Sequence, residues 1–356
     1  MAVLVTGGAG YIGSHAVQRL LRDGRQVLAV DNLFRGHAEA IQLLQTQSGD
    51  AGKLLSFVPA DVGDRDLMLR LIREHRVDTV LHFAALAYVG ESVLQPLRYY
   101  RNNTGATLGL LEAVQGSWES AGSPSGYAGV QKFVFSSTCA SYGEPAKDQI
   151  PIAETCPQVP INPYGWSKLF CERMLKDFAR LAAIQNKPFA WAALRYFNVA
   201  GCDRSGLLGE HHEPETHLIP VCLQACLGQR DALTIHGTDY PTPDGTCIRD
   251  YVHVEDLVDA HLSVLQALRP GEERFYNLGI GEGLSVKQII DSVKRVTGIS
   301  FLVKSGPRRE GDPPALFANP AKIKAELGWH ARITKPDEIV SSAWEWFRRH
   351  PRGYAS

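Results

Sequence analysis

The start of the chain constrains its fold more than any other stretch. Ala2–Thr6 is a short apolar segment typical of a buried strand, and Ser14–Asp23 has the pattern of a helix. The loop between them has both the G-x-G-x-x-G and the G-x-x-G-x-x-G spacing, with glycines at Gly7, Gly8, Gly10 and Gly13. Glycines permit a tight turn and let the backbone approach a pyrophosphate at the start of the helix. A strand, a glycine loop and a helix in this order predict a dinucleotide-binding unit.

A second predicted strand, Gln26–Val30, ends at Asp31. A carboxylate about twenty residues beyond the glycines can accept hydrogen bonds from the adenosine ribose hydroxyls and would repel a 2′-phosphate. The sequence therefore favours NAD over NADP. Two alternatives stay open: Arg35 lies close enough to serve NADP, and Asp31 could instead cap a turn.

Three further predicted strands end in polar or small residues. They are Leu54–Val58, followed by Asp61 and Val62; Thr79–Phe83, followed by Ala84 and Ala85; and Gln131–Phe135, followed by Ser136, Ser137 and Thr138. In a doubly wound sheet these strand ends meet at one edge, where Asp61 would flank the adenine. The small residues would let a flat cofactor lie close, or they could simply serve tight packing.

Two connecting segments have no strand pattern. Phe34–Lys53 is polar and contains glycine, which suggests a surface excursion, whereas Glu91–Val114 predicts one long helix. Asn102 and Asn103 lie inside that helix although asparagine is a middling helix former. We therefore expect them to have a polar role, such as bridging strands or contacting the cofactor.

Tyr164 and Lys168 lie four residues apart, so both side chains would share one helix face. A nearby ammonium favours a phenolate, and lowering a tyrosine pKa by roughly three units takes about 4 kcal/mol. Lys168 and a bound nicotinamide cation could together supply it. With Thr138 orienting a substrate hydroxyl, Tyr164 could remove its proton while hydride leaves the carbon, which is alcohol oxidation without a metal. The alternative is that Thr138 only caps its loop and Tyr164 is a buried structural residue.

The chain of 356 residues suits one large or two small domains. We predict an α/β fold in which a Rossmann-type, doubly wound parallel sheet occupies residues 1–197. A smaller mixed α/β substrate-binding domain would occupy mainly residues 198–356, with a segment at about 250–270 returning to the first domain. The first domain would end with a strand at Trp191–Phe197, and the second would include a helix at Leu218–Leu227.

Composition excludes several classes of function. With 37 basic and 38 acidic residues the net charge is −1, so we expect no nucleic-acid or acidic-membrane partner. Seven cysteines without a C-x-x-C pair suggest reduced thiols and no zinc site, and we predict no bound metal. No apolar run could span a bilayer and no signal-peptide pattern is present, so we expect a cytoplasmic protein.

Several stretches resemble one enzyme family over nearly the whole chain. The glycine loop and Tyr164-x-x-x-Lys168 are similar to the extended short-chain dehydrogenases/reductases. Other segments resemble the UDP-glucose 4-epimerase family within them: Val89-Gly90-Glu91-Ser92, Leu194-Arg195-Tyr196-Phe197-Asn198, Asp239-Tyr240-Pro241-Thr242, Ile248-Arg249-Asp250-Tyr251-Val252-His253-Val254 and Arg308-Arg309-Glu310-Gly311-Asp312. These segments include the predicted substrate domain and are more specific than the shared cofactor motif.

The resemblance implies an NAD-dependent isomerase of galactose metabolism. Tightly held NAD would take hydride from C4 of a UDP-hexose as Tyr164 takes the O4 proton, the 4-keto sugar would turn over, and returned hydride would interconvert UDP-galactose and UDP-glucose. The implied catalytic residues are Tyr164, Lys168 and Thr138. The implied cofactor contacts are Gly7, Gly10, Tyr11, Ile12, Gly13, Asp31, Asn32, Asp61, Val62, Phe83, Ala84, Ala85, Asn102, Ser136, Tyr164, Lys168 and Tyr196. The implied substrate contacts are Thr138, Asn198, His217, Leu218, Thr234, His236, Arg249, Arg309 and Asp312.

The chain departs from some members of this family at three positions. Ala87 replaces a lysine near the cofactor, and His217 replaces an asparagine. Leu316 replaces a tyrosine that limits the sugar pocket, so UDP-N-acetylhexosamines could also be substrates. The resemblance further implies a homodimer through the helices containing residues 91–114 and 164–183.

Three other functions fit the residues less well. A nucleotide-sugar 4,6-dehydratase would need an Asp-Glu pair after Thr138, where this chain has Cys139 and Ala140. A uronate epimerase or decarboxylase would need a cation for the sugar carboxylate, and none is identified. A catalytically inactive NAD-binding protein often lacks the tyrosine or the lysine, and both are present here.

Overall fold

A seven-stranded sheet contains the residues predicted to bind the cofactor. The computed structural model describes residues 1–120, 126–309 and 313–354. The strands of this sheet are β1 (Ala2–Thr6), β2 (Val27–Asp31), β3 (Leu55–Pro59), β4 (Val77–His82), β5 (Lys132–Thr138), β6 (Ala190–Tyr196) and β11 (Glu273–Leu278). Their order is β11-β6-β5-β4-β1-β2-β3, and the pairs β1–β2, β1–β4, β2–β3 and β4–β5 are parallel. This order confirms the predicted doubly wound fold, and it reverses direction between β1 and β4, where such folds bind ligands.

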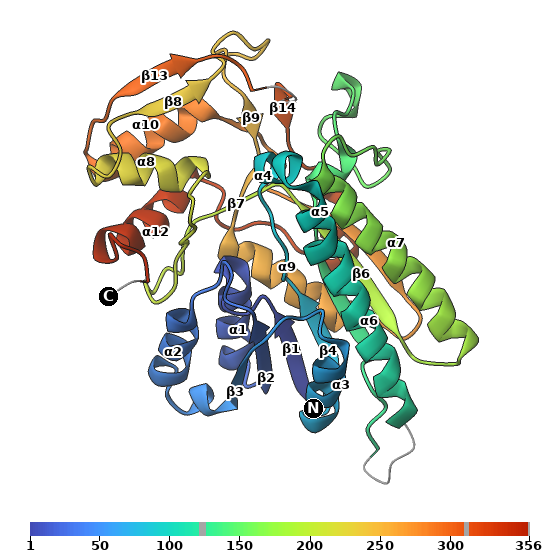
Figure 1. Ribbon diagram of the computed structural model, residues 1–356. Helices are drawn as coiled ribbons and strands as arrows, with labels where there is room; N and C mark the ends of the chain where they lie inside the picture. The colour runs from blue at the N-terminus through green and yellow to red at the C-terminus, as the bar shows by residue number, and fades with distance from the viewer. Residues whose placement is uncertain (121–125, 310–312, 355–356) are drawn as a thin grey trace. The chain divides into compact units, whose positions relative to one another are not determined.

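Along each strand, successive side chains point to opposite faces of the sheet. Helices pack on the sheet and bury the apolar side chains. Leu4 of β1 and Phe133 of β5 belong to one apolar core with α3 (Arg65–Glu74), α6 (Ala106–Ser117) and α7 (Pro163–Ile184). These helices pack against one another in sequence order, as Figure 1 shows for α6 and α7. The helix α1 (Tyr11–Arg22) instead contacts β1 and β2 directly.

Two expectations about the connecting segments were wrong. The supposed surface excursion contains the helix α2 (Ala38–Gln47), because Ala40, Ile41 and Leu44 form an apolar stripe that becomes buried. The supposed single helix at residues 91–114 is divided into α4 (Val89–Leu94), α5 (Pro96–Tyr99), a π-helical turn (Tyr100–Gly105) and α6. The first break lies at Gln95 because Pro96 starts a new helix and disfavours a helical residue before it.

The remaining elements are short strands and helices. The strands are β7 (Asn198–Ala200), β8 (Leu233–His236), β9 (Ile248–Arg249), β10 (Tyr251–His253), β12 (Leu284–Ser285), β13 (Val303–Gly306) and β14 (Ala315–Leu316). The helices are α8 (Leu218–Cys226), α9 (Val254–Ala267), α10 (Val286–Thr297), α11 (Ala321–Leu327) and α12 (Pro336–Arg349). The strands form three small sheets, β10-β7, β12-β9-β14 and β13-β8.

The chain divides into two compact units, each built from several segments. The first unit comprises residues 1–143, 157–195 and 261–276, and the second comprises residues 144–156, 196–260 and 277–356. The returning segment therefore lies at 261–276 rather than at about 250–270, and residues 144–156 group with the second unit. Within the part of the chain that the structure describes, no helix has the length and apolar character needed to cross a membrane.

Candidate active site

The glycine loop after β1 is shaped by contacts that leave no room for side chains. Gly7 has φ +69°, and a Cβ there would lie 2.7 Å from the backbone nitrogen of Ala84. A Cβ on Gly13 would lie 1.9 Å from the carbonyl oxygen of Gly7. Gly10 precedes α1 without a side-chain cap, and the first turn of α1 has no acidic residue. The start of α1 thus keeps amide groups and a favourable dipole for an anionic group.

Asp31 lies at the end of β2, beside the glycine loop. One carboxylate oxygen accepts a hydrogen bond from the Ala9 amide at 3.1 Å, and the other accepts from the Leu33 amide at 2.8 Å. Burial raises the pKa of Asp31, and these backbone donors act in the opposite direction. A carboxylate has about four lone-pair positions, so this one can fix the loop and still accept ribose hydroxyls.

Polar contacts connect the neighbouring predicted cofactor residues. The Asn32 amide group donates to Asp61 at 3.4 Å, and the second carboxylate oxygen of Asp61 accepts from the Gly63 amide at 2.8 Å. Arg35 forms an ion pair with Glu91 at 3.0 Å. The structure thus places Asn32 and Asp61 together after β2 and β3, and it gives Arg35 an acidic partner within the protein.

The end of β4 is anchored by a neutral histidine. His82 contacts the hydroxyl groups of Thr6 at 2.6 Å and Thr107 at 2.8 Å. Burial, and secondarily the charge of Lys168, lowers the pKa of His82 to about 3. The next residues are Phe83, Ala84 and Ala85, all partly buried. His82 therefore fixes the strand end from which these predicted cofactor contacts emerge, and the sequence analysis missed this role.

Asn103, rather than Asn102, bridges two segments of the first unit. Its side chain exchanges hydrogen bonds with the backbone of Leu86 at 2.8 and 3.0 Å and donates to the Ser167 hydroxyl at 2.9 Å. Asn102 donates to the Asn103 side chain at 3.0 Å. Asn103 belongs to the π-helical turn, a feature frequent at functional sites. Asn103 thus has a polar role but joins a loop to α7 rather than two strands, and the predicted cofactor contact of Asn102 stays a prediction.

The three predicted catalytic residues lie at the end of β5 and the start of α7. The helix α7 begins where the Asn162 side chain accepts a hydrogen bond from the Gly165 amide at 2.9 Å. A Cβ on Gly165 would lie 2.5 Å from the Ala140 carbonyl oxygen, so glycine allows α7 to approach the loop after Thr138. Tyr164 packs with Leu86, Tyr99 and Ala140 in a small apolar cluster.

Lys168, one turn further along α7, is almost fully buried. Its Nζ donates to the Ser136 carbonyl oxygen at 2.8 Å and lies 4.9 Å from the centre of the Phe135 ring. Burial lowers the pKa of Lys168 to about 8. The Thr138 hydroxyl accepts from the Ala140 amide at 3.1 Å, so it does cap its loop, yet a hydroxyl can still donate. The arrangement can orient a hydroxyl and exchange its proton.

A buried ion pair supports the strand that carries Thr138. The Arg195 guanidinium contacts the Glu172 carboxylate at 2.6 and 3.0 Å and the Tyr142 hydroxyl at 2.9 Å. Glu172 also accepts a hydrogen bond from the Ser137 hydroxyl at 2.6 Å. Removing one partner of such a pair costs about 3 to 5 kcal/mol. Glu172 was not predicted, because its partner Arg195 lies on a separate segment of the chain.

The predicted substrate residues of the second unit lie mainly on its short strands. Asn198 starts β7, which pairs in parallel with β10. Arg249 on β9 is paired in register with Leu316 on β14. Arg249, which is predicted to bind phosphate, therefore lies next to Leu316, which is predicted to set the size of the sugar pocket. The remaining predicted contact at a strand end, Tyr196, is the last residue of β6.

Other substrate predictions fall on β8 and beyond β13. Thr234 and His236 are separated by one residue on β8, so their side chains share one face. Arg308 forms an ion pair with Asp239 at 2.8 Å, whereas its neighbour Arg309 is exposed. Asp312 lies outside the described residues.

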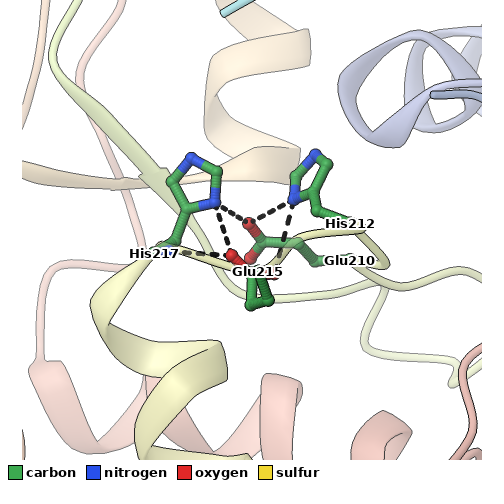
Figure 2. Close-up of side chains that lie close together, drawn as sticks. All are labelled: Glu210, His212, Glu215 and His217. Atoms are coloured by element: carbon green, nitrogen blue, oxygen red, sulfur yellow. Dashed lines mark hydrogen bonds and ion pairs between the residues drawn. The ribbon is translucent and has the colours of Figure 1, made fainter. Parts of the chain in front are cut away.

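His217 belongs to a cluster that the sequence analysis did not anticipate. It lies with Glu210, His212 and Glu215 in the loop before α8, as Figure 2 shows. Burial raises the pKa of Glu210, whereas hydrogen bonds from both histidines outweigh burial and lower that of Glu215. Burial opposes protonation of His212, but the two carboxylates raise its pKa to about 9. The E-x-H-x-x-E-x-H spacing of these residues is a usable signal for a metal site that the pattern of cysteines does not contain.

Comparisons with known proteins agree on one family. The family model described as "NAD dependent epimerase/dehydratase family" matches residues 3–279. A probable UDP-arabinose 4-epimerase of Arabidopsis thaliana is 47% identical over 99% of this chain and 82% of its own length. A UDP-glucose 4-epimerase of Halalkalibacterium halodurans is 44% identical over 100% of this chain and 98% of its own.

A solved structure also resembles the whole chain. It is a UDP-glucose 4-epimerase from Stenotrophomonas maltophila with bound NAD and formylated UDP-arabinopyranose, with a TM-score of 0.88 and 39% sequence identity. The similarity covers 99% of this chain and 99% of that one.

Proposed function

This chain belongs to the NAD dependent epimerase/dehydratase family, and from that premise we propose that it interconverts UDP-galactose and UDP-glucose. It is an NAD-dependent isomerase that acts as a UDP-sugar 4-epimerase. The finer assignment of the hexose pair, and of a role in galactose metabolism, is the proposal. The 4-epimerase chemistry is supported by the position of Tyr164 and Lys168 at the start of α7, beside the loop that follows Thr138. The hexose pair is supported by the relatives named UDP-glucose 4-epimerase at 44% and 42% identity.

The first unit fits a dinucleotide. The glycine loop presents the start of α1, and Asp31 presents a carboxylate beside that loop. Gly7, Gly10 and Gly13 would lie under the pyrophosphate, Asp31 would accept the adenosine ribose hydroxyls, and Lys168 would hold the nicotinamide ribose. When bound, NAD supplies the acceptor and donor of hydride at C4 of the sugar.

Side chains of the protein would transfer the proton of the O4 hydroxyl. Thr138 orients the O4 hydroxyl, and Tyr164 removes its proton in one direction and returns it in the other. Lys168 favours the phenolate of Tyr164 through its positive charge. Inversion requires the 4-keto sugar to present its opposite face to the same residues, so the site must hold the nucleotide firmly and the sugar loosely.

We propose that residues of the second unit hold the nucleotide. Arg249 and Arg309 would bind the diphosphate, since a guanidinium offers charge and paired hydrogen-bond donors. Thr234 and His236 would flank the uracil, and Asp312 would accept ribose hydroxyls. Asn198, His217 and Leu218 complete the proposed contacts.

Two other substrates compete with the UDP-hexose pair. UDP-arabinose is suggested by the names of relatives at 45–47% identity, and its pentose lacks the C6 group of a hexose. UDP-N-acetylglucosamine is suggested by Leu316, because leucine is smaller than tyrosine and would leave space beside C2. Both are 4-epimerisations and would use the same Tyr164 and Lys168.

Product analysis separates these possibilities. Purified protein without added cofactor would be incubated in turn with UDP-galactose, UDP-N-acetylgalactosamine and UDP-arabinopyranose, and products would be resolved by chromatography. We expect conversion of UDP-galactose at the highest kcat/KM. A higher kcat/KM for UDP-arabinopyranose would contradict the proposed hexose preference, and conversion of none, even with NAD added, would contradict 4-epimerase activity on these sugars.

We further propose that the protein is a cytoplasmic homodimer. All seven cysteines are free thiols, which suits a reducing compartment. The dimer would form through α4, α5, α6 and α7, whose exposed apolar side chains include Leu94 at 83%, Leu97 at 79% and Phe170 at 41% exposure. A second copy of the same surface would cover these side chains.

A further inference from the structure

We propose that Glu210, His212, Glu215 and His217 form a binding site for one divalent cation, best matched by Zn²⁺. None of the four residues is proposed to contact the dinucleotide or to act in the reaction at C4, whereas His217 is also a proposed contact of the UDP-sugar. All four residues come from residues 210–217, the last eight residues of the loop between β7 and α8. The loop therefore contributes a complete ligand set without help from a distant segment.

The spacing of the potential ligand atoms fits a single ion. One ligand atom from each residue lies within 4.8 Å of the others. Glu210 Oε1 is 3.3 Å from Nδ1 of both His212 and His217, and Glu215 Oε2 is 3.5 Å from His212 Nδ1. Ligand atoms of a tetrahedral zinc ion lie about 3.4 Å apart, given bond lengths of roughly 2.0 to 2.2 Å. Figure 2 shows the two imidazole rings and the two carboxylates pointing toward one another.

The contact between Glu215 and His217 is shorter than the others, and a bound metal would have to replace it. Glu215 Oε1 lies 2.8 Å from His217 Nδ1, which is a hydrogen-bond distance. Glu215 Oε1 also accepts from the amides of Thr216 and His217, both at 2.7 Å. These amides fix the carboxylate as outer-shell groups commonly do in metal sites. Zn²⁺ would replace the proton between Glu215 and His217 and would also displace the second proton of His212, because both imidazoles bind it in their neutral form.

Charge and burial also favour a cation. The side chains of Glu210 and Glu215 are each only 3% exposed, although two carboxylates repel each other when buried together. A divalent cation with two carboxylates and two neutral imidazoles has no net charge. Imidazole nitrogen with carboxylate oxygen is a donor set that suits zinc better than Mg²⁺ or Ca²⁺, which prefer oxygen alone.

A bound cation would restrict the backbone at the start of α8. His217 is the residue before this helix and Leu218 is its first residue. Four ligands within this loop would restrict the backbone at both positions. We therefore expect zinc to raise the thermal stability of the protein. A tighter binding of UDP in the presence of zinc is also expected, and that second effect alone rests on the proposed function.

The test measures metal binding directly. Untagged full-length protein is stripped with a chelator and titrated with ZnCl₂ by calorimetry. We expect one saturable site per chain, and at least tenfold weaker binding in Glu210→Gln and in His212→Gln. The matched control is Glu213→Gln, whose carboxylate is 86% exposed and is not among the four cluster residues. Equal affinity in all four proteins, or no saturable site in the unaltered chain, would overturn the proposal.

A second measurement uses only the unaltered protein, so its result does not depend on whether a variant folds. The stripped protein is titrated with CoCl₂ and its absorption spectrum is recorded. We expect one equivalent to give visible bands of four-coordinate cobalt without thiolate charge-transfer bands. Thiolate bands would instead place the ion on cysteines such as Cys222 or Cys226, and bands of six-coordinate cobalt would contradict a closed four-ligand site.

Discussion

At the scale of single residues, Lys168 links burial to the proposed chemistry. Its side chain is buried, and its Nζ has a backbone carbonyl partner at 2.8 Å. Because burial disfavours the ammonium, the pKa of Lys168 falls to about 8. The group nevertheless stays largely protonated at neutral pH, where its charge would favour the Tyr164 phenolate. His82 is neutral, because its pKa is lowered to about 3, and so it adds no second positive charge beside Lys168.

Replacing Tyr164 by phenylalanine removes the group proposed to move the O4 proton. We expect Tyr164→Phe to lower kcat at least about 100-fold, since proton transfer commonly contributes that much. The bound dinucleotide should be retained, measured by its absorbance after denaturation. Tyr100→Phe is the control, because its ring contact with Phe170 survives and Tyr100 has no proposed role in catalysis. Turnover in Tyr164→Phe close to that of the control would contradict the mechanism.

The lowered pKa of Lys168 predicts a specific pH dependence of stability. In the unfolded chain the lysine keeps a pKa near 10.5, whereas in the folded protein it is about 8. The unfolded state therefore binds more protons between these values, and stability contributed at this site rises with pH across that window. Relative to Lys168→Met, the unaltered dinucleotide-free protein should gain about 1.5 kcal/mol between pH 8 and 9.5. A difference in urea unfolding free energy that stays constant with pH would contradict this.

At the scale of elements, α7 joins the catalytic residues to an exposed apolar surface. Its buried side carries Tyr164 and Lys168, whereas Trp166 and Phe170 are exposed at 37% and 41%. Leu94 and Leu97 are exposed on α4 and α5, and α4 and α5 both contact α7. This surface is where the proposed dimer would form.

A charge placed on that surface should disrupt the dimer. We expect the unaltered protein to have the mass of two chains by light scattering, and Leu97→Asp to shift it toward the mass of one. Leu302→Asp is the control, because Leu302 is also exposed, at 56%, but lies in the second unit. A single-chain mass for the unaltered protein would refute the homodimer.

The elements also show which local signals were sufficient. The strands β1 and β2 and the helix α8 were predicted within about a residue, because each has an apolar pattern of its own. The two-residue strands β9 and β14 have no such pattern, since they exist through their pairing with each other across the chain. The missed helix α2 did have a signal in Ala40, Ile41 and Leu44, which its polar neighbours obscured.

At the scale of the whole molecule, the order of the strands in the seven-stranded sheet explains why the cofactor-binding residues could be predicted as a group from the sequence. The ends of β1, β2, β4 and β5 meet at one edge because their pairs are parallel. Residues that follow predicted strands could therefore be grouped without coordinates. The Glu172–Arg195 pair and the Asn103 bridge could not be grouped in this way, because each depends on how separate segments pack.

In the proposed reaction, one hydride leaves C4 of a UDP-hexose and returns to the same carbon. The most direct measurement uses UDP-galactose deuterated at C4, incubated in ordinary water with purified protein and no added cofactor. The account predicts UDP-glucose that retains deuterium at C4, as seen by mass spectrometry and proton NMR. Product that has lost the deuterium to solvent, or no conversion even with NAD added, would contradict it.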